Sequence, residues 1–237
     1  NRLSTISHSR IGTTSYTYDD NSNLVTVSYP NATTAEYTYD TMDRVTSLIN
    51  RHGAEVINSF NYSHDAAGMI TDVTLPESQT ISYTYDAINR LTGEHKTRVK
   101  INKRGISKTV TAYEHVYSYD PVGNRLTMAR PQRFTKTYQY NADNELLSWT
   151  KVKGEELVKS LTYTYDNNGS RINKHVENIN EDPFDITYQY DTENRLTTVT
   201  TPATMVSYTY DGLGRKVSAT KNGQTVHYLY DGMNVVA

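Results

Sequence analysis

A four-residue motif, Tyr-x-Tyr-Asp, recurs along the chain and constrains its fold more than any other feature. Complete copies end at Asp19, Asp40, Asp86, Asp120, Asp166, Asp191, Asp211 and Asp231. Two further copies are altered: His64 replaces the second tyrosine in one, and Asn141 replaces the aspartate in the other. Successive copies start 20 to 34 residues apart, a period that is typical of stacked supersecondary units. The sequence therefore predicts a single array of ten repeats over residues 1–237.

The motif also explains an unusual aromatic composition. The chain contains 21 tyrosines but only three phenylalanines and one tryptophan, and nineteen of the tyrosines lie in motif copies. A tyrosine ring buries apolar area while its hydroxyl still needs a hydrogen-bond partner. Because only 36% of the residues are hydrophobic, the sequence predicts a sheet with an aromatic face and a hydroxyl-rich face, without a thick, dry core. We expect motif tyrosines of neighbouring strands to lie side by side as cross-strand pairs.

Each repeat has the pattern of a β-hairpin. Across residues 81–85, Tyr83 and Tyr85 alternate with hydroxyl side chains, which predicts a strand. Asp86 is expected to bond backbone N–H groups in a turn, and Asn89 to adopt a left-handed conformation there. A return strand then follows.

A second turn closes each repeat, and its clearest example is Asn222-Gly223, a strong hairpin signal. Strand, turn, strand and turn in succession predict an all-β fold built from tandem antiparallel β-hairpins. A β-propeller is the alternative, because two repeats total about 45 residues and would make one four-stranded blade.

An arginine follows six of the motif aspartates by four or five residues. Two structural roles fit this offset: an ion pair across the turn, or a guanidinium lying on a neighbouring tyrosine ring. In the altered sixth repeat both positions change, to Asn141 and Glu145, and this joint change fits an electrostatic pair across the turn. Structural roles are predicted for the repeat-motif residues Tyr16, Tyr18, Asp19, Tyr37, Tyr39, Asp40, Tyr83, Tyr85, Asp86, Arg90, Tyr117, Tyr119, Asp120, Arg125, Tyr163, Tyr165, Asp166, Arg171, Tyr188, Tyr190, Asp191, Arg195, Tyr208, Tyr210, Asp211, Arg215, Tyr228, Tyr230 and Asp231.

Residues 93–116 form the main irregularity and lengthen one spacing to 34 residues. The stretch is basic, and residues 102–105 have the pattern of the tip of a longer hairpin. Its alternating cations predict either a solvated, protruding hairpin or a contact site for cargo, a partner or a polyanion. The candidate partner-contact residues are Lys96, Arg98, Lys100, Lys103, Arg104 and Lys108.

Several classes of function receive no support. A net charge of −2 provides no global basic field that would attract nucleic acid, and the sequence has no run of about 18 apolar residues that would span a membrane. Motif aspartates recur once per repeat at the same turn position, which indicates a structural role and no active site. The oxygen-rich turns and the seven histidines lack the spacing of calcium or zinc sites. We therefore expect no catalysis, no cofactor and no metal.

The extended motif Tyr-x-Tyr-Asp-x-x-Gly/Asn-Arg-Leu strongly resembles the RHS or YD repeat. It is seen at residues 83–91, 117–126 and 188–196. That family includes bacterial polymorphic toxins, the B and C components of insecticidal Tc toxin complexes, and animal teneurins. The resemblance implies tandem hairpins that form a curved strip of a hollow shell. In the toxins such a shell encloses a toxic domain, and in teneurins it forms part of an adhesion receptor.

The resemblance implies a non-enzymatic shell wall that encapsulates or presents a polypeptide cargo such as a toxin domain. The alternative is an adhesion module that binds a glycan or a receptor. Expected partners are further YD repeats or self-association through open edges, an enclosed polypeptide, and a glycan. The expected location is secreted or cell-surface, in a bacterium, and the chain is expected to be part of a larger shell. Asp120-Pro121-Val122-Gly123 lies inside a repeat, unlike the self-cleavage motif of bacterial shells, so no cleavage residue is assigned.

Overall fold

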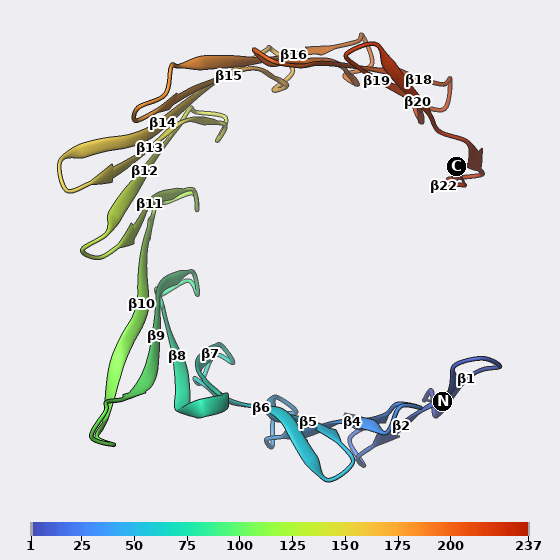
Figure 1. Cartoon of the computed structure of the whole chain (residues 1–237), viewed down its shortest axis with the longest axis vertical. Coiled ribbons are helices and arrows are strands. Elements are labelled where there is room, and N and C mark those ends of the chain that lie inside the picture. The colour runs from blue at the N-terminus through green and yellow to red at the C-terminus, as the bar shows by residue number, and fades with distance from the viewer. Residues whose placement is uncertain (1, 237) are drawn as a thin grey trace. The chain divides into compact units, whose positions relative to one another are not determined.

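The computed structural model describes residues 2–236 and contains two compact units, Asn1–Tyr117 and Ser118–Ala237. The prediction of an all-β, antiparallel fold is confirmed (Figure 1). Strands β1 to β20 belong to an antiparallel sheet, and β21 with β22 forms a separate two-stranded sheet. The only helical segment among the described residues is a three-residue 3-10 turn, η1 (Pro76–Ser78). Nowhere in residues 2–236 is there a helix of the length and apolarity that crossing a bilayer requires.

Unit 1 is a meander in which each strand pairs with the next one along the chain. Its strands are β1 (Thr5–His8), β2 (Gly12–Tyr18), β3 (Leu24–Ser28), β4 (Thr33–Tyr39), β5 (Val45–His52), β6 (Glu55–His64), β7 (Ile70–Leu75), β8 (Gln79–Tyr85), β9 (Leu91–Ile101) and most of β10 (Ser107–Tyr119). Even-numbered strands end in the Tyr-x-Tyr part of the motif, with His64 in place of the second tyrosine in β6, and odd-numbered strands from β3 onward are the return strands.

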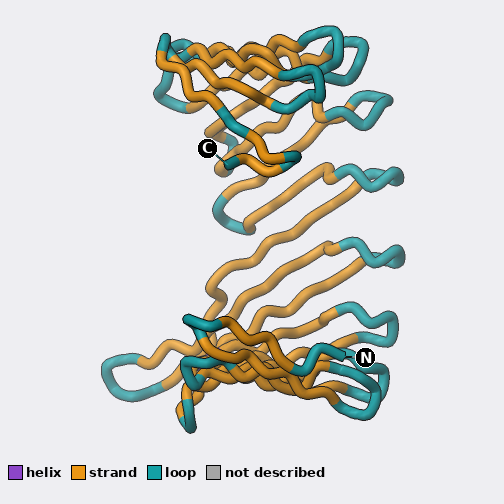
Figure 2. Tube along the Cα trace, turned by 90° about the vertical axis from the view of Figure 1, so that its right-hand side faces the viewer, coloured by secondary structure: helices purple, strands orange, loops and turns teal. Residues whose placement is uncertain are grey.

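Unit 2 repeats the same arrangement (Figure 2). Its strands are β11 (Arg125–Arg130), β12 (Phe134–Tyr140), β13 (Leu146–Lys153), β14 (Glu156–Tyr165), β15 (Arg171–Asn178), β16 (Phe184–Tyr190), β17 (Leu196–Thr200), β18 (Met205–Tyr210), β19 (Lys216–Lys221), β20 (Gln224–His227), β21 (Tyr230–Asp231) and β22 (Asn234–Val235). The Asn222-Gly223 pair has positive φ angles of 48° and 86°, as the two-residue hairpin turn between β19 and β20 requires.

The propeller alternative is wrong. A propeller would interrupt strand pairing after every four strands, because each blade is a separate small sheet. In unit 1 the pairing instead continues from β1 through β10, and in unit 2 it continues from β11 through β20. Every turn within a unit connects neighbouring strands directly, so the pairing has no break at which a blade could end.

The core of each unit is thin, as the composition predicts. The buried apolar side chains are Val27, Ala35, Val73, Tyr138, Leu161 and Val176, with exposed fractions of 3–9%. Four of them are cross-strand neighbours within the sheet: Val27 pairs with Ala35, and Leu161 pairs with Val176. Among the described residues no large side chain is less than 2% exposed. Stability therefore depends heavily on contacts within the sheet.

The strand pairings of the described residues do not place motif tyrosines side by side as expected. Two motif strands are always separated by a return strand, so that a motif tyrosine faces an aliphatic neighbour more often than another ring. Tyr16 pairs with Val27, Tyr188 with Val199, and Tyr208 with Ala219. The prediction failed because it placed consecutive motif strands next to each other and left out the return strand between them.

The opposite face carries the expected hydroxyl groups, and they bond across the strands. The Thr38 hydroxyl lies 2.9 Å from that of Thr46 and 2.7 Å from that of Ser47. In unit 2 the corresponding hydroxyls of Thr209 and Ser218 are 2.6 Å apart. Cross-strand hydroxyl pairs of this kind stabilise the sheet.

Candidate functional site

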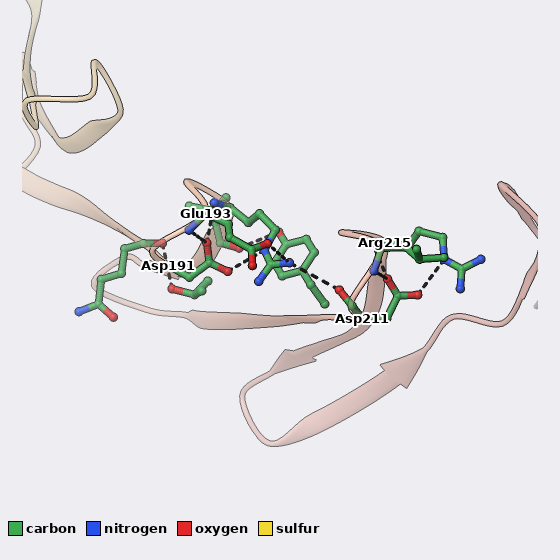
Figure 3. A network of polar contacts seen from close by, with 10 residues as sticks. Asp191, Glu193, Asp211 and Arg215 are labelled. Atoms are coloured by element: carbon green, nitrogen blue, oxygen red, sulfur yellow. Dashed lines mark hydrogen bonds and ion pairs between the residues drawn. The ribbon is translucent and has the colours of Figure 1, made fainter.

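The motif turn is the unit of structure that every repeat shares. In the fourth repeat, Asp86 Oδ1 accepts the backbone N–H groups of Ile88 at 3.0 Å and Arg90 at 2.9 Å. Asp86 Oδ2 accepts Arg90 Nε at 2.7 Å. One carboxylate therefore closes the turn and also holds the arginine that starts the return strand. The same geometry recurs at Asp191 and Asp211, where Glu193 adds a second carboxylate to Arg195 at 2.7 Å (Figure 3).

The residue three positions after the motif aspartate has a positive φ angle in nine repeats. These residues are Ser22, Asp43, Gly68, Asn89, Gly123, Asn144, Gly169, Asn194 and Gly214, with φ between 58° and 103°. Glycine reaches this region at no steric cost, and asparagine and aspartate tolerate it better than other residues. The restricted choice of residues at this position follows from the turn geometry.

The offset of the arginine decides whether it forms an ion pair across the turn, whereas arginines at both offsets lie over tyrosine rings, as Arg195 does at 5.2 Å from the ring centroid of Tyr210. At four residues after the aspartate, Arg44, Arg90, Arg195 and Arg215 form ion pairs across the turn at 2.7 Å. At five residues, Arg125 lies 4.6 Å from the ring centroid of Tyr138, and Arg171 lies 4.8 Å from that of Tyr188. One extra residue moves the arginine side chain further along the bulged start of the return strand. Both roles that the sequence left open, the ion pair across the turn and the guanidinium on a tyrosine ring, therefore occur. In the altered repeat, Asn141 Nδ2 donates to Glu145 Oε2 at 2.6 Å. The contact across the turn is therefore kept, but the residue at the motif position is now the donor and the residue four positions later is the acceptor.

The arginines of the ion pairs also join consecutive turns within a unit. Arg44 Nη1 donates to the backbone oxygen of Asp65 at 2.8 Å, and Arg195 Nη1 donates to that of Asp211 at 3.5 Å. Arg215 donates likewise to the carbonyl oxygen of Gly232. A charged donor that also satisfies a turn carbonyl makes a stronger bond than a neutral one. At these three turns an arginine therefore fastens one repeat to the next.

A β-bulge recurs beside the second tyrosine of the motif. Thr17 pairs with Thr26 whereas Tyr18 pairs with Leu24, so one residue of the return strand has no partner. The same register shift occurs at Tyr39, His64, Tyr85, Tyr140, Tyr165, Tyr190 and Tyr210. A bulge disrupts the local ladder and leaves groups to be satisfied otherwise.

The hydroxyl of the second motif tyrosine supplies the missing partner in the preceding repeat. Tyr39 donates to the carbonyl oxygen of Leu24 at 2.8 Å, and Leu24 is the residue that pairs with Tyr18. Equivalent bonds of 2.7–3.2 Å are made by Tyr85, Tyr140, Tyr165, Tyr190, Tyr210 and Tyr230. Sequence reasoning missed this bond. The recurrence of tyrosine at this position was the available signal, because phenylalanine would be sufficient on an apolar face if the hydroxyl had no partner.

The turn contacts lower the pKa of the motif carboxyl groups. For Asp40, Asp86, Asp191 and Asp211 the pKa lies below its ordinary value. The main cause is the backbone N–H of the residue four positions later, and the arginine side chain adds to it while desolvation opposes it. A carboxylate that accepts several hydrogen bonds is stabilised in its charged form. These groups are therefore ionised structural anchors.

Hairpin β9–β10 carries all six candidate contact cations. Lys100 lies directly opposite Lys108, and Arg98 lies opposite Val110. At its tip Asn102 Oδ1 accepts the N–H groups of Arg104 at 2.9 Å and Ile106 at 3.0 Å, which repeats the motif turn. All six are exposed except the half-buried Lys96. None takes part in an ion pair found within residues 2–236.

The base of the same hairpin holds a polar cluster that the sequence did not indicate. The Tyr113 hydroxyl donates to Glu94 Oε1, and Glu94 Oε2 lies 3.7 Å from His115 Nδ1. Burial, together with this hydrogen bond to Glu94, raises the pKa of Tyr113 to about 12. The His115 ring centroid is 5.1 Å from that of Tyr113. Only the strand register brings these residues together, because they come from different strands and lie outside the motif.

The described residues contain no group of three or more His, Cys, Asp or Glu side chains arranged to hold a metal ion. The repeated turn, the bulge and the hydroxyl bond instead define the chain as a protein of tandem YD-type β-hairpins. It belongs to the teneurin YD-shell family, whose model matches residues 1–104 and 94–236. No curated protein sequence matches it.

Solved structures share the fold at low sequence identity. The crystal structure of TcdB2-TccC3-TEV is 17% identical, with a TM-score of 0.61, and the match covers 92% of this chain and 14% of that chain. The Photorhabdus luminescens Tc holotoxin pore is likewise 17% identical, with a TM-score of 0.60 and the same coverage. The crystal structure of TcdB2-TccC3 is 16% identical, with a TM-score of 0.60, and covers 94% of this chain. The chain therefore spans about one seventh of those proteins.

Proposed function

We propose that this chain is part of the wall of a shell that encloses or presents a polypeptide, and that it works without catalysis. The observation that carries the proposal is the way each repeat is attached to its neighbour. Tyrosine hydroxyls and arginines bond across successive repeats, while few side chains are buried. Such a sheet is extensible by adding repeats and needs no second layer. The YD-shell family membership and the fold shared with Tc toxin components support this role.

An open sheet edge indicates which partners this wall has. The outer edge of β1 has no strand paired to it among the described residues, and unpaired strand edges bind other strands. We infer that further YD repeats, or a second copy of the chain, cover this edge. A toxin domain is the cargo that the resemblance suggests, and secretion or display on a bacterial cell surface follows from the same resemblance.

A crosslinking experiment in the full-length protein tests the wall. Val199 pairs with Tyr188 and lies on the aromatic face, whereas its neighbour Thr198 pairs with Gln189 and lies on the hydroxyl face. A photo-crosslinking residue is placed at one position or the other. A wall with cargo on one side gives polypeptide crosslinks from one of these positions and not from its neighbour. Absence of polypeptide crosslinks from both positions would contradict enclosure.

One observation favours the alternative, an adhesion module: half-exposed tyrosine rings lie beside arginine and lysine side chains on the aromatic face. Aromatic rings of this kind also stack on sugars. A glycan array with the purified chain separates the two roles. Specific binding that is lost on replacing Tyr228 with alanine would favour an adhesion module over a wall.

A further inference from the structure

Unit 2 carries three lysines at directly opposed positions on adjacent strands. Lys136 of β12 pairs with Lys151 of β13, and Lys151 pairs with Lys159 of β14. Directly opposed residues share a sheet face, with β-carbons about 4.5–5.5 Å apart, and like charges in this position destabilise the sheet. We call Lys136, Lys151 and Lys159 the lysine row. Lys136 lies two residues from Tyr138 along β12, so the row lies on the aromatic face of the sheet.

The first two lysines of the row bend away from each other onto aromatic rings. Lys136 Nζ lies 4.7 Å from the ring centroid of Trp149, and Lys151 Nζ lies 4.5 Å from that of Phe134. Both rings occupy diagonal positions on the neighbouring strand. Cation–π contacts offset part of the repulsion. No ion pair in the described part of the chain involves any lysine of the row.

The surroundings of the row are also cationic. Burial, and then the charges of Lys151, Arg125 and Lys159, lower the pKa of Lys136. All three lysines of the row are half-buried, in contrast to the freely solvated tip of hairpin β9–β10. The sheet thus holds several partly desolvated like charges together, an arrangement that lowers its own stability and that an anion would relieve.

A depression adjoins the row at the turn between β11 and β12. Its volume is about 410 Å³, and its lining includes Arg130, Arg133, Lys151 and Lys153, with Phe134 as an aromatic wall. No carboxylate is among its lining residues. The acidic residue nearest in register is Glu156, opposite Lys153 near the tip of hairpin β13–β14. The depression and the row therefore form one continuous cationic and aromatic surface.

We propose that this surface binds an acidic segment of a polypeptide, whose carboxylates neutralise the lysine row and whose apolar groups contact Phe134 and Trp149. The cations extend from β11 to β14, a distance of about 14 Å across three strand spacings. One small anion cannot reach all of them, whereas an extended chain with carboxylates on alternate residues can. The choice of a polypeptide as ligand rests on the proposed function, in which the sheet lies against a polypeptide.

Trp149, the single tryptophan of the chain, reports on the site because it contacts Lys136. The full chain is titrated with a decaglutamate peptide, and binding is followed by tryptophan fluorescence and by calorimetry. We expect saturable binding that weakens by about tenfold or more in the triple variant Lys136→Gln, Lys151→Gln, Lys159→Gln, as for truncated charge contacts at other interfaces. The thermal midpoint of this variant should stay the same or rise, because the opposed charges are gone; a merely structural role for the lysines would lower it.

A matched control removes the same charge elsewhere. The triple variant Arg10→Gln, Arg51→Gln, Lys221→Gln, at positions outside both the lysine row and hairpin β9–β10, should change the affinity by less than about twofold. Equal weakening in both triple variants would show attraction by net charge alone and overturn the site. Absence of binding to the unaltered chain would also overturn it, while leaving the wall to be judged by the Val199 and Thr198 crosslinks. Equally tight binding of pyrophosphate or a single-stranded oligonucleotide would overturn the assignment to a polypeptide.

Discussion

At the scale of single residues, the motif aspartate combines two functions that are usually divided between side chains. One oxygen caps backbone N–H groups and the other binds a guanidinium, so the carboxylate determines both the turn and the start of the return strand. The asparagine of the altered repeat keeps the first function, with Asn141 Oδ1 accepting the N–H of Glu145 at 2.8 Å. The charge can therefore be lost where the partner changes as well.

We predict that Asp211→Asn lowers stability near neutral pH and weakens its dependence on acid. The folded-state pKa of Asp211 is depressed, first by the N–H of Arg215. Its stabilisation is therefore present above the unfolded pKa of about 3.9 and is lost as the pH falls through the lower folded value. Chemical denaturation between about pH 2 and pH 7 measures both effects. Asp182→Asn, outside the motif, is the control; an equal change there would refute the assignment.

A second residue-scale prediction concerns the tyrosine hydroxyl. Tyr210 donates to the Leu196 carbonyl oxygen at 2.7 Å, so Tyr210→Phe should destabilise the protein by about 1 kcal/mol. Tyr208, on the same strand, has its ring under Lys216 at 5.3 Å and keeps that contact as phenylalanine. Tyr208→Phe should therefore cost less than about 0.5 kcal/mol. Urea denaturation of the two variants compares them, and equal losses would contradict the role given to the hydroxyl.

At the scale of the element, a repeat is a motif strand, a motif turn and a bulged return strand. The bulge creates a carbonyl that the next motif tyrosine satisfies, which explains why the second tyrosine is present in nine of the ten motif copies. The exception is His64, which has the bulge register but makes no bond of this type with any residue of the described range 2–236. By analogy with Tyr39 and Leu24, the acceptor there would be the carbonyl oxygen of Val45, the residue paired with Tyr39.

We therefore predict that His64→Tyr stabilises the protein by about 1 kcal/mol, the net value of one added hydrogen bond. His64→Phe supplies the ring without the hydroxyl and separates packing from hydrogen bonding. Thermal and urea denaturation of the two variants provide the measurement. A phenylalanine variant as stable as the tyrosine variant would show that the ring alone matters.

At the scale of the whole molecule, the open edge of the sheet is the feature with the largest consequence. Tyr16 N–H donates to the Ser4 carbonyl oxygen, and hydrogen-bonding direction alternates along an antiparallel strand. The N–H groups of Thr5 and Ser7 are therefore directed away from β2. The strand is exposed along its length, so these groups are available to another strand.

We predict concentration-dependent self-association of the purified chain through this edge. Thr5→Pro removes one outward N–H group and should reduce association, since proline cannot donate to a ladder. Light scattering during gel filtration over a range of concentrations measures the mass. Thr5→Ala is the control and should associate like the unaltered chain. A stable monomer at the highest concentration would contradict the prediction.

The sequence by itself determined the repeat, the all-β class and the turn chemistry, because these depend on residues close together in the chain. Period-two alternation, an aspartate and a residue suited to positive φ are local signals, and the structure uses them as expected at Asp86 and Asn89. The resemblance to YD repeats could be recognised from the sequence because the repeat motif is also local, and membership of the YD-shell family is confirmed.

Only the tertiary structure decided which side chains become neighbours. Register placed aliphatic residues between the motif tyrosines, gave each second hydroxyl a carbonyl partner in the preceding repeat, and aligned Lys136, Lys151 and Lys159 in one row. Those residues are far apart in the sequence, and a shift of one residue would move each to the other face. Contacts of this kind depend on the position of every bulge, which the order of residues alone does not specify.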